Sequence, residues 1–235
     1  MKRSPRVWLL LLLPFFYLST GFAAMSAPYR GENRHVSGFH AISNSGHVAV
    51  EVRLGSEETL RLEGDDEAIR NIETVVEQGI LKVRFRRGVR QRNWGKVTAY
   101  VTAKQVDELS QSGSGSITVL DPIKGSGIDA ALSGSGKMTF ELDMETLNAS
   151  ISGSGRIRVS GQALQSNVSV SGSGNFDGAR LVSGDARLKV AGSGSIDAHV
   201  DRQLDASISG SGNITYSGDA QTDVRTAGSG KVRRR

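Results

Sequence analysis

The chain has 235 residues, including 29 glycines and no cysteine, and a formal net charge of +5. The lack of cysteine excludes disulfide bonds and the lipid attachment of bacterial lipoproteins, so stability must come from a packed core and backbone hydrogen bonds. Three of the 29 basic residues lie within the first six positions, which leaves 26 against 24 acidic ones, and this near-balance argues against a nucleic-acid-binding protein.

Residues 1–27 have the pattern of a secretory signal peptide. Lys2, Arg3 and Arg6 precede an apolar run over residues 7–17, and small residues follow. Cleavage after position 23, 26 or 27 fits the pattern equally. The alternative is an uncleaved anchor, but the run has about half of the roughly 20 residues that span a bilayer. We therefore expect export to the periplasm, the cell surface or the medium, with no transmembrane span after cleavage.

Residues 28–110 are predicted to form a β-rich N-terminal cap region. Alternating apolar and polar residues predict half-buried strands. The strands are expected over residues 36–42, 47–54, 60–63, 80–85 and 96–102. A short helix is predicted over residues 65–72, with its acidic residues in the first turn, and Val75-Val76 either extend it or form a strand. We expect this region to continue into the following repeats, pair with their first coil and cover its open edge.

Residues 111–232 repeat the tripeptide Gly-Ser-Gly. Leaving aside an extra copy at 125–127, the copies begin at Gly113, Gly134, Gly153, Gly172, Gly192, Gly210 and Gly228, in steps of 18 to 21 residues. A fixed period near 19 indicates a stacked repeat rather than a flexible Gly/Ser linker. Glycine provides the positive φ that tight corners need.

Apolar residues occupy fixed positions around each tripeptide. The position two residues after it holds Ile117, Met138, Ile157, Phe176, Ile196, Ile214 and Val232. Two further apolar positions lie two and four residues before it. Residues two apart share one face of a strand, so each repeat is predicted to be two or three short strands joined by tight turns. The expected fold is all-β, a single-stranded parallel β-helix (a β-solenoid), right-handed, with coils of about 19 residues.

Five segments together carry a resemblance to a known family. They are Val36–Ile42, Val48–Val52, Gly64-Asp65 with Ile69, Val97–Thr102, and Leu109 with the Ser-Gly repeats that follow it. The sequence resembles the putative auto-transporter adhesin, head GIN domain family over residues 35–232. The resemblance implies a secreted or envelope-associated bacterial protein with a β-solenoid body and an adhesin-like role. It transfers no functional residue.

The residues that usually carry chemistry do not form a motif in this sequence. His35, His40, His47 and His199 lack the cysteine or spaced carboxylate partners of a zinc site. No serine lies in a Gly-x-Ser-x-Gly nucleophile elbow. A calcium-binding β-roll needs a nine-residue repeat with a regular aspartate, and here Asp129, Asp177 and Asp197 recur only irregularly. We therefore predict no catalytic residue, no cofactor and no metal.

Two charged groups remain as alternatives. A polysaccharide-acting enzyme on a β-helix scaffold is the alternative function, and its residues would be Asp177, Arg180, Asp197, His199, Asp201 and Arg202 on neighbouring coils. The competing interpretation is ordinary solvent-facing charge. A basic group around Trp94 comprises Arg84, Arg86, Arg87, Arg90, Arg92 and Lys96. It is either a patch for anionic glycans or lipid head groups, or a charged hairpin.

The C-terminal residues 231–235 are predicted to protect the open edge of the last coil, because they carry four basic side chains. The sequence as a whole predicts a non-enzymatic, exported β-solenoid. We expect a structural or adhesin-like binding module, and its partner is expected to be a glycan, the extracellular matrix or another envelope or surface protein.

Overall fold

The structure, a computed structural model, describes residues 30–89 and 94–235. Strands make up 74% of it and helix 3%, which confirms the all-β prediction. The predicted signal peptide, together with Arg90 and Arg92, lies outside the described residues.

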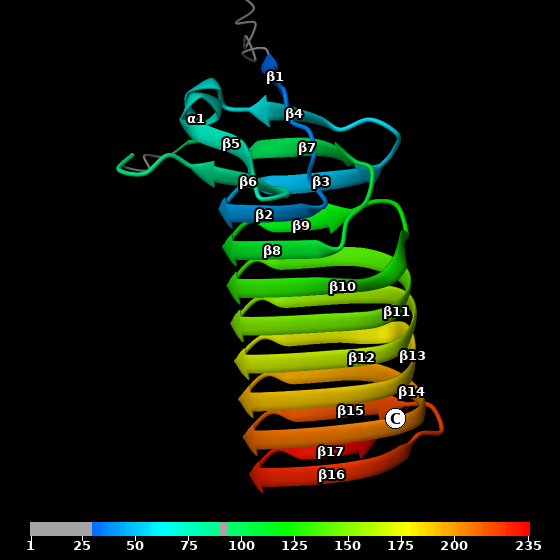
Figure 1. Cartoon of the computed structure of the whole chain (residues 1–235). Coiled ribbons are helices and arrows are strands. Elements are labelled where there is room, and N and C mark those ends of the chain that lie inside the picture. The colour runs from blue at the N-terminus through cyan, green and yellow to red at the C-terminus, as the bar shows by residue number, and fades with distance from the viewer. Residues whose placement is uncertain (1–29, 90–93) are drawn as a thin grey trace, which may run out of the picture.

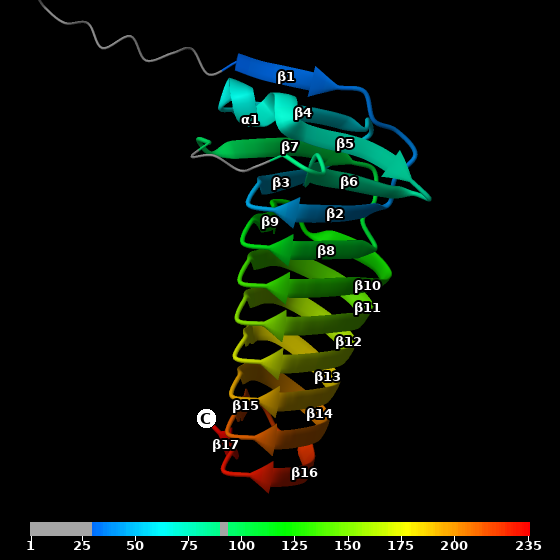
Figure 2. The same cartoon turned by 90° about the vertical axis from the view of Figure 1, so that its left-hand side faces the viewer.

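The molecule is a rod built from stacked coils with a cap at one end (Figures 1 and 2). Its strands form one continuous hydrogen-bonded sheet, and the coils make about seven turns with a spacing of about 19 residues. The predicted β-solenoid is confirmed. No helix in the described ranges has the length and apolar character needed to cross a membrane.

The cap contains α1 and the first seven strands. Its elements are β1 (Arg30–Arg34), β2 (Ala41–Gly46), β3 (Ala49–Leu54), β4 (Thr59–Gly64), α1 (Asp66–Asn71), β5 (Ile72–Glu77), β6 (Ile80–Phe85) and β7 (Val97–Ala103). The coils are built from β8 (Glu108–Gly113), β9 (Ser116–Val119), β10 (Ile123–Gly134), β11 (Lys137–Gly153), β12 (Arg156–Gly172), β13 (Asn175–Gly192), β14 (Ser195–Gly210), β15 (Asn213–Ser217), β16 (Gln221–Gly228) and β17 (Lys231–Arg234).

The short helix of the cap starts where the sequence predicts. The Asp65 side chain accepts a hydrogen bond from the backbone N–H of Ala68 at 2.8 Å, the interaction of an N-cap residue. This hydrogen bond lowers the pKa of Asp65. The helix ends at Ile72, whose backbone is extended, so Val75-Val76 belong to strand β5.

Four of the five strands predicted in the cap coincide with β3, β4, β6 and β7 to within two residues. The strand predicted over residues 36–42 is wrong in position, because β2 begins only at Ala41. Gly38 has a φ of +73°, a conformation that interrupts an extended run. Strands β2 and β3 pair in parallel with β8 and β9, which confirms that the cap pairs with the first coil.

Each central coil is one long bent strand rather than the two or three short strands that were predicted. Strand β12 pairs with β11 from Lys137↔Arg156 to Gly153↔Gly172. The pairing continues without a break through Ser160-Gly161, which lie opposite Glu141 and Leu142. The chain therefore bends there without leaving the hydrogen-bonded ladder.

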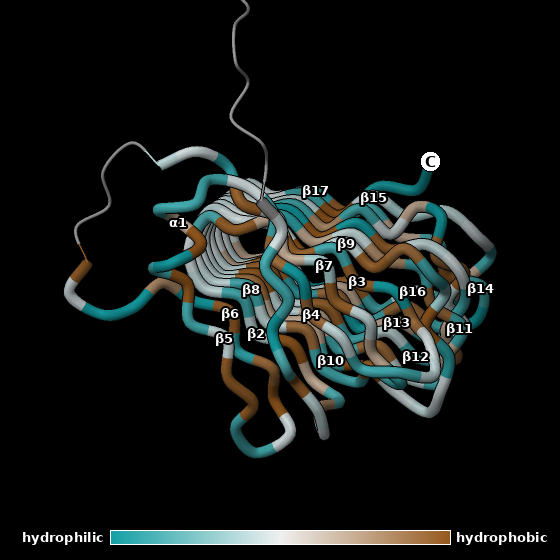
Figure 3. The backbone as a smooth tube through the Cα atoms, turned by 90° about the horizontal axis from the view of Figure 1, so that it is seen from above, coloured by the Kyte–Doolittle hydropathy of each residue, from teal (hydrophilic) through white to brown (hydrophobic). Residues whose placement is uncertain are grey.

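The register stacks equivalent residues of successive coils, as the sequence predicts. Met138, Ile157, Phe176 and Ile196 pair in turn from one coil to the next. Along β11, buried and exposed residues alternate over most of its length. Seen along the stack in Figure 3, the coils superpose, so hydrophobic residues of one coil lie over those of the next. The core is thus a narrow column enclosed by the coils.

The stack ends in a coil that no other described strand covers. Strand β16 pairs with β14, and β17 pairs with β15. All eight residues of β16 are exposed. Two arginines of the predicted edge-protecting segment turn onto the side of the molecule, where Arg234 pairs with Asp219 and Arg235 pairs with Asp197.

Candidate functional site

The coil segment that precedes each Gly-Ser-Gly corner presents one flat outer surface, which we call the polar face. Its side chains stack in outward columns because the parallel register repeats from coil to coil. One column contains Asn148 and Asn167, and it forms a ladder of amide hydrogen bonds. Asn167 Nδ2 donates to Asn148 Oδ1 at 3.0 Å, and Asn148 Nδ2 donates to Asp129 Oδ1 at 2.8 Å.

A hollow of about 270 Å³ opens on this face over β12, β13 and β14, and we call it the polar hollow. It is lined by Gln165, Ser166, Asn167, Asp185, Ala186, Arg187, Gln203 and Asp205. Two adjacent columns supply the outward side chains. One column is Gln165, Asp185 and Gln203, and the other is Asn167, Arg187 and Asp205. Members of the two columns are two residues apart along each strand, so they point to the same side.

The hollow combines amide, carboxylate and guanidinium groups. Arg202 Nη2 donates to Asp185 Oδ2 at 2.9 Å, and Arg187 Nε lies 3.9 Å from Asp205 Oδ2. The side-chain amides of Gln165 and Gln203 form no hydrogen bond with another described residue, although the backbones of both residues lie in the sheet. Each amide offers two donors and an acceptor. The hollow is therefore equipped to bind a ligand rich in hydroxyl groups.

Sequence reasoning missed this hollow, although the sequence contains a signal for it. Gln165, Asp185 and Gln203 each lie seven residues before the first glycine of a corner, and Asn167, Arg187 and Asp205 lie five before. A search for polar residues at fixed distances from the repeat would have found both columns. The prediction instead concentrated on charged residues that follow the corners.

A second hollow, of about 450 Å³, lies at the bend of the coils and is partly apolar. We call it the apolar hollow. It is lined by Gly125, Asp143, Met144, Glu145, Gln162, Ala163, Leu164, Val182 and Gly184. Leu164 is 59% exposed and Val182 is 45% exposed, which is unusual for aliphatic side chains in this protein. These two side chains give the hollow its apolar part.

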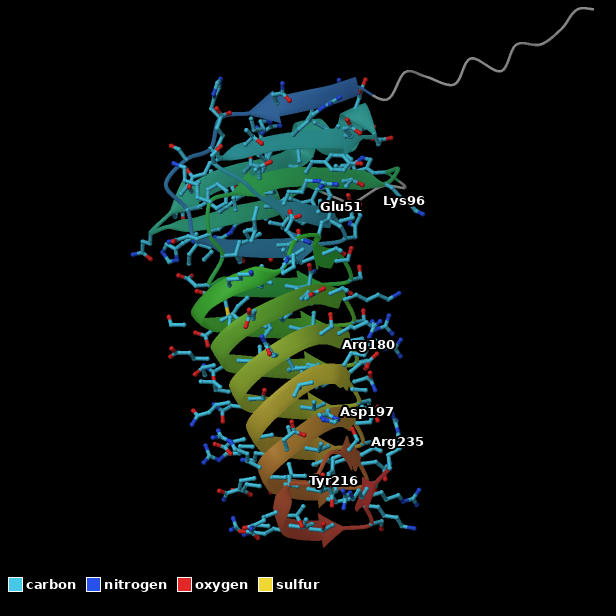
Figure 4. All side chains as sticks on the ribbon, turned by 90° about the vertical axis from the view of Figure 1, so that its right-hand side faces the viewer. Glu51, Lys96, Arg180, Asp197, Tyr216 and Arg235 are labelled. Carbon is cyan, nitrogen blue, oxygen red and sulfur yellow. The ribbon has the colours of Figure 1, made fainter. Side chains whose placement is uncertain are left out.

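The residues of the enzyme alternative lie on neighbouring coils but are divided among separate ion pairs. Asp177 and Asp197 are adjacent in one column. However, Asp177 pairs with Arg158 at 2.8 Å, and Asp197 pairs with Arg235 at 3.1 Å. Figure 4 shows Arg180, Asp197 and Arg235 following one another along one side of the stack.

The other members of this group face different partners. His199 Nε2 lies 3.0 Å from Asp201 Oδ1, and its Nδ1 is 2.9 Å from Ser217 Oγ. Arg202 reaches the polar hollow, where it binds Asp185. Five of the six residues are therefore engaged in four separate ion pairs.

The basic group in the cap lines an open, polar depression of about 750 Å³. Its walls are Glu73, Glu77, Lys82, Arg84, Arg86 and Arg87. Lys82 pairs with Glu77 at 2.7 Å and Arg84 with Glu73 at 2.9 Å, so acidic residues neutralise part of the patch.

Trp94 has a packing role beside this depression. Its ring stacks on Phe85 with centroids 5.4 Å apart, and Phe85 stacks on His47 at 4.6 Å. Trp94 is partly buried against the core. It therefore extends the hydrophobic core of the cap rather than standing free among the basic side chains.

The histidines do not gather into one site. His40 Nδ1 lies 2.7 Å from Asp107 Oδ1, and this hydrogen bond, with the negative charge of Asp107, raises the pKa of His40. His47 lies in the aromatic stack of the cap and His199 lies near the other end of the rod. In the described part of the chain, no three His, Asp or Glu side chains are placed to share a metal ion.

Known structures share this architecture. A putative adhesin from Bacteroides fragilis is 20% identical, with a TM-score of 0.85 over 89% of this chain and 98% of its own. A putative lipid binding protein from Parabacteroides distasonis is 23% identical, with a TM-score of 0.73 over 89% and 98%. A putative adhesin from Parabacteroides merdae is 22% identical, with a TM-score of 0.71 over 89% and 97%. At these identities the likeness shows the fold.

Among curated protein sequences, none matches this chain. A family model does match, and it covers residues 38–220, which include most of the cap and the coils through β15. The resemblance seen in the sequence is thereby confirmed. The chain belongs to the putative auto-transporter adhesin, head GIN domain family.

Proposed function

We propose that this protein is a non-enzymatic, exported, adhesin-like module of a bacterial envelope that binds a glycan in its polar hollow. The family and the adhesins of the same fold support the adhesin-like role. The pattern of residues 1–27 supports export through a signal peptide to the periplasm or the cell surface.

The observation that carries the proposed ligand is the pair of polar columns around the hollow. Gln165 and Gln203 present amides without partners among the described residues, while Asn167 and Asp205 add further acceptors on the adjacent column. A sugar carries hydroxyl groups at intervals of a few ångströms. Stacked coils repeat their side chains about every 4.8 Å, a spacing that suits successive hydroxyl groups.

The division of charge supports a binding module over the alternative polysaccharide-acting enzyme. Hydrolysis of a glycosidic bond uses two carboxyl groups that flank the same bond. Here Asp177 and Asp197 each face a different arginine, and the polar hollow holds Asp185 already bonded to Arg202.

A second candidate ligand is an acyl chain or other apolar group at the apolar hollow. The exposed Leu164 and Val182 favour it. One protein of the same fold is described as a putative lipid binding protein. Burying both side chains against an apolar ligand would remove their surface from water, which is favourable.

The test is an array that carries both glycans and lipids, probed with the purified protein and followed by product analysis of every hit. We expect binding to glycans without cleavage. Gln203→Ala should weaken that binding about tenfold, because it removes hydrogen bonds to the ligand. Gln105→Ala is the matched control, since Gln105 is an exposed glutamine that lines neither the polar hollow nor the apolar hollow.

Other outcomes contradict particular parts of the proposal. Binding to lipids that Leu164→Ser abolishes, with no glycan binding, would replace the glycan by the apolar ligand. Cleavage of a bound glycan would establish the enzyme alternative and overturn the non-enzymatic role.

A further inference from the structure

The free edge of β16 is an unusual surface for this protein. Its residues Thr222, Val224 and Thr226 pair with Leu204, Ala206 and Ile208, which are buried in the core. The three therefore occupy interior positions of the stack, yet they are exposed, and Val224 is 44% exposed. An exposed edge strand of this kind is a template for pairing with another strand.

The backbone of β16 has hydrogen-bonding groups directed toward this edge. In the coils, Asp129 N–H donates to Asp107 O of the preceding coil, at 2.9 Å. Asp223 lies in the same column as Asp129, five coils further on. Because N–H groups alternate sides along a strand, those of Thr222, Val224 and Thr226 point away from β14, toward the free edge.

The sequence of β16 is complementary to itself in the antiparallel direction. When Val224 is opposite Val224 of a second copy, Asp223 is opposite Arg225 and Thr222 is opposite Thr226. Opposite charges and threonine pairs facing each other across strands are stabilising. Shifting the centre by one residue places Asp223 opposite Asp223, or Arg225 opposite Arg225, and like charges in this position are destabilising.

The free edge of β17, at the same C-terminal end of the rod, opposes pairing with a second copy. Lys231 and Arg233 point outward on β17, next to Val232 of the interior column. Arg234 lies opposite Tyr216 in the strand register, and its guanidinium pairs with Asp219 on the side of the molecule. Two copies of β17 placed edge to edge would bring these positive charges together. The end of the rod is thus complementary to itself on one side only.

We propose that the free edge of β16 is a dimer interface. In the dimer, β16 pairs with β16 of a second copy of this chain, antiparallel and centred on Val224. The two polar faces then join into one sheet, related by a two-fold axis perpendicular to it. An eight-residue strand buries less surface than a standard interface, so the dimer is weak, with a dissociation constant of roughly micromolar or above.

The proposed dimer also bears on binding. Gln203 and Asp205 of the polar hollow pair directly with Gln221 and Asp223 of β16. A two-fold axis perpendicular to the joined sheet therefore leaves both polar hollows on the same side of the dimer. Provided that the glycan function proposed above holds, two hollows on one side give bivalent binding to a polymer or a cell surface.

The test of the interface uses sedimentation equilibrium of the purified chain, and it does not depend on any ligand. We expect reversible dimers over a range of about 1 to 500 µM. Asp223→Arg and Arg225→Asp should each weaken self-association about tenfold or more, because each places like charges opposite one another. An equal mixture of the two variants should associate, since each supplies the charges that the other lacks.

Two further variants keep the result interpretable. Lys189→Asp reverses a charge in the same outward column as Arg225, two coils away, and should leave dimerisation unchanged. The double variant Asp223→Arg with Arg225→Asp exchanges the two charges and should dimerise like the natural chain. Both controls show whether a charge change alone disturbs the fold.

Three results would overturn the proposal. One is that the natural chain remains monomeric at the highest concentration. This result would also be seen if β16 instead binds a strand of a different protein. Another is a dimer that neither single variant weakens, because its interface would lie elsewhere. The third is failure of the mixed variants to associate while the natural chain dimerises, since the register would then be wrong.

Discussion

At the residue scale, the geometry of the Gly-Ser-Gly corners explains why both outer positions of the tripeptide are glycine. The first glycine of each corner has a positive φ, +112° at Gly153, and a Cβ there would lie 2.6 Å from Gly134 O of the preceding coil. The second glycine is closely approached as well, since a Cβ at Gly155 would lie 2.7 Å from Gly136 O. Both the conformation and the stacking distance therefore exclude a side chain.

This crowding predicts that Gly153→Ala destabilises the protein. The substitution combines an unfavourable φ with a clash against backbone, and strained conformations of this kind cost about 1–3 kcal/mol. The free energy of unfolding, measured by urea denaturation followed by circular dichroism, should fall by at least this amount.

Gly127→Ala is the matched control for that substitution. Gly127 belongs to the extra copy of the tripeptide, which the structure places inside β10 rather than at a corner. A Cβ there would meet its nearest neighbour, Thr146 O, at 3.4 Å, an ordinary contact. If Gly127→Ala costs as much as Gly153→Ala, corner geometry is not the source of the effect.

At the scale of the strand, the interior was predictable from sequence and the polar hollow was not. Alternation along each repeat identifies interior columns such as the one through Ile157 and Phe176, because one side of every strand is buried. The polar hollow depends on which outward side chains are long, charged or unpaired on three particular coils. The sequence also predicted short strands joined by tight turns, because glycine often marks a turn. In the structure the strand bends at Gly161 but stays paired with its neighbour.

One interior column changes from apolar to polar where the cap meets the coils. From the cap toward the coils, this column contains Asn44, then Gln111, then Leu132. Asn44 Nδ2 donates to Gln111 Oε1 at 2.7 Å and to Val48 O at 2.8 Å, and both amides are buried. The buried Asn44 Oδ1 has no hydrogen-bond partner among the described residues.

This pair predicts a strongly non-additive double-mutant cycle. Asn44→Val alone and Gln111→Leu alone should each lower the free energy of unfolding by about 1–3 kcal/mol, because each leaves a buried polar group unpaired. The double variant should be close to the natural protein, since it removes both amides and the unpaired oxygen. Val48 O keeps its hydrogen bond from Ser116 N in that variant.

Urea denaturation of the four proteins measures the coupling. Additive losses in the double variant would show that the two amides are stabilised by their surroundings independently rather than by each other. The polar pair would then have no role as a unit in joining the cap to the first coil.

At the scale of the whole molecule, the two ends of the rod are unequal. The N-terminal end is closed by the cap, in which β4 pairs antiparallel with β7 and β1 covers β4. The C-terminal end leaves the interior positions of β16 exposed. In a stack where each coil contacts only its neighbours, local stability depends on how many neighbours a coil has. Opening should therefore begin at β16 and β17.

Hydrogen exchange measured by mass spectrometry tests this directly, at a protein concentration low enough to keep the chain monomeric. Amides of β16 and β17 should exchange at least about tenfold faster than those of β11 to β13, because end coils open without disturbing the centre. Phe176→Ala creates a cavity in the middle of an interior column, and it should speed exchange in the coils on both sides, from β12 to β14. Val232→Ala, at the end of the same column, should speed exchange only in the last coil. Uniform protection from β10 to β17 would contradict this, and it would mean that the rod opens as one cooperative unit despite its uncovered end.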